Sequence, residues 1–101
     1  MGIDVYWKDE CGEILAAVKD SDALAQMSGL LFRQTGSACV RFIDPAGDAC
    51  FNQLQIPVLA SEIRDLLPAI GNPRWQSHLQ AVISLVEGAS KSNTYVWFQG
   101  D

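Results

Sequence analysis

Hydrophobic and polar side chains alternate along residues 3–8, the period-2 pattern of a strand with one buried face. Asp9 and Gly12 follow with the chemistry of a hairpin turn, because Asp begins a type I turn and Gly accepts a positive φ. A returning strand is expected over residues 13–18. The pattern therefore predicts that the chain opens with a β-hairpin.

A second strand, turn and strand are expected in the middle of the chain. Residues 38–43 alternate in the same way, and residues 44–47 (DPAG) form a turn signal in which Pro45 already holds the required φ. Residues 49–55 would then return alongside. This pattern predicts a second hairpin.

Two helices are indicated by apolar spacing. Ser21 is a candidate N-cap for a short helix that presents apolar residues as far as Leu31. Residues 57–70 carry an apolar stripe at helical spacing, and Pro68 is expected to end or kink this helix.

A third helix, over residues 72–88, has the clearest limits. Asn72 is a candidate N-cap, Pro73 suits the first helical position, and Gly88 ends the apolar repeat. An aromatic-rich strand is predicted over residues 94–98.

The predicted order is ββαββααβ. Short hairpin connections pair antiparallel neighbours, and amphipathic helices need a surface on which to bury their stripes. We expect one α+β domain over residues 1–101, a two-layer sandwich in which an antiparallel sheet of about five strands carries the helices on one face. A chain of 101 residues has the length for a single core.

The charge and the cysteine content indicate which classes of partner are excluded and which cellular compartment is expected. Twelve acidic and seven basic residues give a net charge of -5, which repels phosphate backbones and anionic lipids, so neither nucleic acid nor membrane is expected as a partner. No apolar run approaches the ~20 residues that span a bilayer. Cys11, Cys39 and Cys50 lack CxxC spacing, as is typical of reduced thiols. We therefore expect a cytoplasmic protein.

Candidate catalytic residues are few. His78 is the only histidine, and no phosphate loop, dinucleotide fingerprint, nucleophile elbow or metalloprotease motif is present. The sequence thus predicts no catalytic residue, no cofactor and no metal site. One alternative stays open, a thiol-dependent or small-molecule-binding enzyme that uses Cys39 or Cys50. The predicted second hairpin places Arg41 opposite Cys50, where a cation favours the thiolate, and the fold would have to bring His78 to them.

The most informative feature is the sheet face that points away from the helices. Alternation directs an aromatic and polar set onto it, comprising Asp4, Tyr6, Lys8, Arg41, Asn52, Tyr95, Trp97 and Gln99. Tyr, Trp and Arg are enriched at interface hot spots. We interpret five members as candidate partner-binding residues: Tyr6, Arg41, Asn52, Tyr95 and Trp97. The alternative is that the first helix, or aromatic packing across strands, covers this face within one molecule.

Three segments resemble a family of short standalone bacterial proteins without an assigned activity: Gly2–Trp7 (GIDVYW), Arg41–Pro45 (RFIDP) with Gly47 and Asp48, and Phe98–Asp101 (FQGD). The resemblance spans the chain and rests on strand and turn segments. It implies a complete bacterial protein and carries over no catalytic residue.

These observations favour a non-enzymatic interaction module that binds another protein or a second copy of itself through this face. A toxin-neutralising immunity protein is one form of this hypothesis, because a small acidic chain suits electrostatic capture of a basic toxin. A structural subunit of a larger assembly is another.

Overall fold

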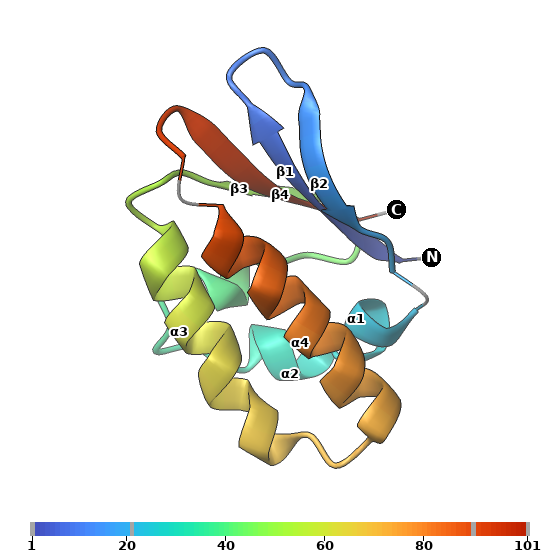
Figure 1. Cartoon of the computed structure of the whole chain (residues 1–101). Coiled ribbons are helices and arrows are strands. Elements are labelled where there is room, and N and C mark those ends of the chain that lie inside the picture. The colour runs from blue at the N-terminus through green and yellow to red at the C-terminus, as the bar shows by residue number, and fades with distance from the viewer. Residues whose placement is uncertain (1, 21, 90, 101) are drawn as a thin grey trace.

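The computed structural model describes residues 2–20, 22–89 and 91–100, arranged as a sheet with helices packed on one side of it (Figure 1). In chain order the elements are β1 (Ile3–Asp9), β2 (Ile14–Val18), α1 (Ala23–Gln26), α2 (Ser28–Phe32), the 3₁₀ turn η1 (Val40–Phe42), β3 (Asp48–Phe51), α3 (Ile56–Leu66), the 3₁₀ turn η2 (Leu67–Ala69), α4 (Pro73–Gly88) and β4 (Thr94–Gly100). The predicted α+β class is confirmed.

The sheet is antiparallel throughout, with the strand order β2-β1-β4-β3. The predicted first hairpin is confirmed as β1 and β2. Its first strand pairs on the other side with β4, from Ile3 opposite Gly100 to Asp9 opposite Thr94, so the first and last strands of the chain are the two central strands of the sheet. Among the described residues the sheet has four strands, where the sequence predicted about five.

The missing strand is the one predicted over residues 38–43, and this prediction is wrong. The backbone N–H groups of Ala38, Cys39 and Val40 donate to the carboxylate of Glu62 on α3, at 2.6, 2.9 and 3.1 Å. Backbone donors held by this carboxylate are not available for pairing between strands. The segment therefore turns as η1, and β3 pairs with β4 instead of forming a second hairpin.

The predicted helix limits are confirmed where local capping sets them. The side chain of Asn72 accepts the N–H groups of Arg74 and Trp75, Pro73 is the first residue of α4, and Gly88 is the last. Pro68 ends α3 as predicted, because the chain leaves the α-helix at η2.

The predicted first helix is divided into α1 and α2, which meet at Met27. Ser21, the predicted N-cap, lies outside the described residues, and Asp22 precedes α1 at a φ of 70°.

The core lies between the inner face of the sheet and the helices. Its largest fully buried side chains come from both layers: Phe98, Ile3, Leu24, Met27, Leu31, Ile43, Leu59, Ile63, Leu79, Val5, Val40 and Val82. The rings of Phe51 and Phe98 meet edge to face, with centroids 5.8 Å apart. Phe42, which the predicted strand directed inward, is instead 55% exposed because it belongs to η1.

Candidate partner-binding face

The face of the sheet opposite the helices carries a central row of side chains across its four strands. Tyr6 lies opposite Ala17 on β2 and Trp97 on β4, and Trp97 lies opposite Cys50 on β3. Opposed residues of antiparallel strands point to the same side, so these side chains share one surface. We call this surface the outer face; its described members are Asp4, Tyr6, Lys8, Ile14, Ala17, Asp48, Cys50, Tyr95, Trp97 and Gln99.

The two ends of the outer face differ in charge. On one side of the central row Lys8 lies between Ile14 and Tyr95. On the other side Asp4 and Asp48 flank Gln99. None of the described helices packs on this surface (Figure 1). The outer face is thus open, with aromatic rings at its centre and opposite charges towards its two ends.

Lysine side chains cover Tyr6, which is only 8% exposed. Nζ of Lys19 lies 4.5 Å from the Tyr6 ring centroid, donates to the Tyr6 hydroxyl and stands 3.7 Å from Oδ2 of Asp4. The hydrogen bond to Tyr6 is the main cause that raises the pKa of Lys19. Nζ of Lys8 lies 5.3 Å from the Tyr6 ring and 5.2 Å from the Trp97 ring, in cation–π geometry. Lys8 and Lys19 therefore pack on the aromatic rings of the outer face and hold them in place.

The structure places the five candidate partner-binding residues differently. Tyr95 and Trp97 are half-buried on the outer face, and Tyr6 is buried there beneath the lysines. Asn52 is exposed just beyond β3, where its side chain caps the turn into α3. The placement of Arg41 on the sheet is wrong, because this residue lies in η1, where Nη1 donates to the carbonyl of Thr35 at 2.9 Å.

The four residues of the enzyme alternative are divided among three parts of the fold, η1, β3 and α4. Cys39 is buried at the start of η1, where burial and a neighbouring carboxylate raise the pKa of its thiol. Cys50 lies on the outer face, and burial raises its pKa although Lys8 acts in the opposite direction. Arg41 is in η1, and His78 is on α4. The predicted position of Arg41 opposite Cys50 is therefore wrong, because Cys50 pairs with Trp97. Both pKa shifts disfavour the reactive thiolate.

His78 faces a buried carboxylate instead of a thiol. The side chain of Asp20 is fully buried and accepts the N–H groups of Ile3, Leu24 and Ala25 at 2.8, 3.0 and 3.1 Å. Nε2 of His78 lies 3.5 Å from Oδ1 of Asp20 and is buried without a hydrogen bond. This cluster ties the start of β1 to α1 and α4, which is a structural role.

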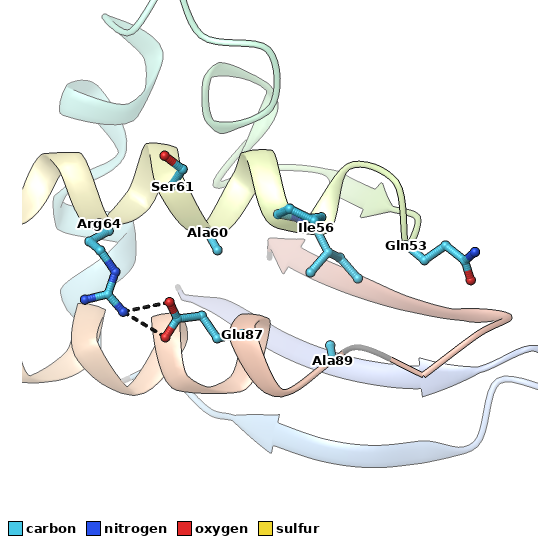
Figure 2. Close-up of a pocket in the computed structure, with 8 residues that line it drawn as sticks. Gln53, Ile56, Ala60, Ser61, Arg64, Glu87 and Ala89 are labelled. Atoms are coloured by element: carbon cyan, nitrogen blue, oxygen red, sulfur yellow. Dashed lines mark hydrogen bonds and ion pairs between the residues drawn. The ribbon is translucent and has the colours of Figure 1, made fainter.

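A groove of about 630 Å³ runs between α3 and the end of α4 (Figure 2). It is lined by Gln53, Ile56, Pro57, Ala60, Ser61, Arg64, Glu87 and Ala89. Nη2 of Arg64 donates to both carboxylate oxygens of Glu87, at 2.8 and 2.7 Å, so an ion pair stands at one end. The small side chains of Ala60 and Ala89 lie along the hollow. Its volume falls within the range of small-molecule sites.

Sequence reasoning missed three charged residues that organise the structure: Lys19, Asp20 and Glu62. A capping signal was available for Asp20, since an acidic residue directly before a helical stripe is typical of an N-terminal cap. Glu62 gave no local signal, because its backbone partners lie 22 to 24 positions earlier in the chain.

The described residues contain no group of three or more His, Cys, Asp or Glu side chains placed to hold a metal ion. None of the described helices combines the length and the apolar character needed to cross a bilayer.

Comparison with known proteins returns no family model, no curated protein and no solved structure that matches this chain. Function is therefore inferred from the geometry of the outer face and the groove.

Proposed function

We propose that this chain is a non-enzymatic protein-interaction module that binds a protein partner through the outer face. The observation that carries the proposal is the position of Trp97, at the centre of a sheet surface on which no described helix packs (Figure 1). Tyr95 and Lys8 extend this surface beside it. Aromatic side chains near the centre of an open patch with a polar rim are typical of interface hot spots.

The charge of the outer face favours a partner of mixed charge. Lys8 and Lys19 balance Asp4 and Asp48 among the described residues that form or contact this face, although the whole chain carries -5. A uniformly basic partner is best matched by a uniformly acidic surface. The outer face therefore gives no electrostatic support to the capture of a basic toxin, and an immunity role would need another surface.

The proposal is tested by site-specific photo-crosslinking in the cells that make the protein. Benzoylphenylalanine at position 97 keeps an aromatic ring on the outer face, and the same residue at position 80 places the probe on the exposed side of α4. We expect a discrete protein adduct from position 97 and none from position 80. An absence of adducts at position 97, or equal adducts at both positions, overturns the proposal.

A second candidate function is the binding of a small amphipathic acid in the groove of Figure 2. The supporting observation is the combination of an apolar hollow with Arg64 at one end, where a ligand carboxylate would compete with Glu87. We expect medium-chain carboxylates to raise the melting temperature of the wild type but not of Ser61→Trp, whose larger side chain fills the groove. No shift in the wild type would exclude this candidate.

A further inference from the structure

We propose that the partner of the outer face is a second copy of this chain, packed face to face with its strands antiparallel across the interface. The two-fold axis runs along the central row of Tyr6, Trp97 and Cys50. The inference rests on the proposed function, since it names the partner of the same surface.

The charge distribution of the outer face selects this orientation. On β1, Lys8 and Asp4 lie on either side of Tyr6, two positions away in each direction. Rotation about the central row places Lys8 over Asp4 of the second copy, and symmetry repeats the contact in the other direction. The Lys8 end of each face then lies over the end at which the two carboxylates of Asp4 and Asp48 outnumber the one ammonium group of Lys19.

The alternative rotation, about an axis parallel to the strands, lacks this match. It would stack the Lys8 ends of the two faces on each other, and likewise the ends that carry Asp4 and Asp48, where Lys19 offsets only one of the two carboxylates. Like charges facing each other across an interface disfavour association. Because positive and negative side chains balance on the outer face, two acidic chains can associate there without bringing two negatively charged surfaces together.

The small area of the outer face limits the stability of the dimer. Four strands of four to seven residues make a surface of roughly 360 Å² per copy, at a strand spacing of about 4.8 Å and a rise of about 3.3 Å. Two such faces bury less than the roughly 1,200 Å² of a stable interface. We therefore expect a weak, reversible dimer.

Cys50 provides a direct test of the orientation. Rotation about the central row places Cys50 opposite Cys50 of the second copy, across a sheet spacing of about 10 Å. Rotation about an axis parallel to the strands would bring β2 of the second copy to that position. A bis-maleimide of matching reach links the first arrangement alone. The Cys11→Ser variant removes the other exposed thiol, and Cys50→Ser serves as the matched control.

The crosslinking is performed from about 10 μM to about 1 mM protein at mildly alkaline pH, with mono-maleimide labelling to establish that Cys50 reacts. We expect the dimer yield of Cys11→Ser to rise with concentration and Cys50→Ser to give none. Lys8→Glu should lower the dimer yield, normalised to the mono-maleimide labelling of Cys50 in the same variant, at least about tenfold, because both symmetric contacts become repulsive. Lys91→Glu makes the same charge change in the loop before β4 and should leave the yield unchanged.

The outcomes separate this inference from the proposed function. A labelled Cys50 that gives no dimer at about 1 mM, together with a monomer in sedimentation equilibrium, overturns the second copy. So does a dimer that links through Cys11, or one that Lys8→Glu and Lys91→Glu affect equally. In each case an adduct from position 97 with a different protein would leave the interaction module standing. An adduct between two copies supports both.

Discussion

Oε1 of Glu62 on α3 accepts the backbone N–H of Cys39 at 2.9 Å, which fixes the segment before β3 to a helix that follows it in the chain. The same carboxylate also accepts the N–H groups of Ala38 and Val40. One side chain thus holds the start of η1 in place.

Glu62→Gln is expected to lower the free energy of unfolding by about 1–3 kcal/mol, because an amide has one acceptor oxygen and no charge for three backbone donors. Urea denaturation at neutral pH measures the loss. Glu87→Gln removes the same charge from an exposed pair with Arg64 and should cost about 1 kcal/mol or less. Equal losses in the two variants would contradict the role assigned to Glu62.

The stabilisation from Glu62 should depend on pH. Burial raises the pKa of this carboxyl, but the three N–H groups and Arg41 outweigh burial and hold it below the ordinary value of 4.5. A folded-state pKa below the unfolded one stabilises the fold above pH 4.5, and this contribution disappears as the pH falls through the lowered value. The difference between wild type and Glu62→Gln should therefore shrink on acidification. Urea midpoints at pH 7 and pH 3 test this, and a constant difference would refute it.

Asp20→Asn is expected to destabilise the fold by about 2 kcal/mol or more, because a fully buried carboxylate with three backbone donors loses its charge. The change affects the junction of β1 and α1, so hydrogen exchange should accelerate there first. Asp65→Asn, an exposed position on α3, should change the stability by less than about 0.5 kcal/mol. Unchanged exchange at Ile3 and Leu24 in Asp20→Asn would count against this account.

Gly100→Ala should be destabilising by about 1–3 kcal/mol. A Cβ at this position would lie 2.5 Å from the carbonyl oxygen of Asp44 and would also collide with Pro45, so the loop before β3 or the end of β4 must move. A Cβ at Gly71 meets no atom within 4 Å, and Gly71→Ala should be neutral or slightly stabilising. The melting temperatures of the two variants, measured by thermal unfolding, test both expectations. If Gly100→Ala melts at the wild-type temperature, as Gly71→Ala should, the account of Gly100 is contradicted.

Thiol labelling of the folded protein should modify Cys11 and Cys50 and leave Cys39 unmodified until the chain unfolds. Cys39 is 2% exposed, and burial together with Glu62 raises the pKa of its thiol, so both access and thiolate fraction are low. Mass spectrometry after a brief treatment with a maleimide, with and without denaturant, counts the sites. Rapid modification of Cys39 in the folded state would restore the thiol-enzyme alternative.

Local patterns in the sequence were enough to predict the elements whose limits depend on neighbouring residues. The first hairpin follows from alternation and from Gly12, which adopts the positive φ of 83° that its turn requires. The limits of α4 follow from Asn72 and Gly88. Alternation also placed Tyr95 and Trp97 on the outer face, because side-chain direction along a strand is a local property.

Features that depend on contacts between distant residues could not be predicted from local patterns. Residues 38–43 have the alternation of a strand, but Glu62 binds their backbone donors from α3, and only the folded chain brings the two segments together. Because of this non-local contact, residues 38–43 do not form a strand and Arg41 does not lie on the outer face. The pairing of β1 with β4 likewise joins the first and last strands, so local spacing could not show which side chains of the outer face lie beside one another.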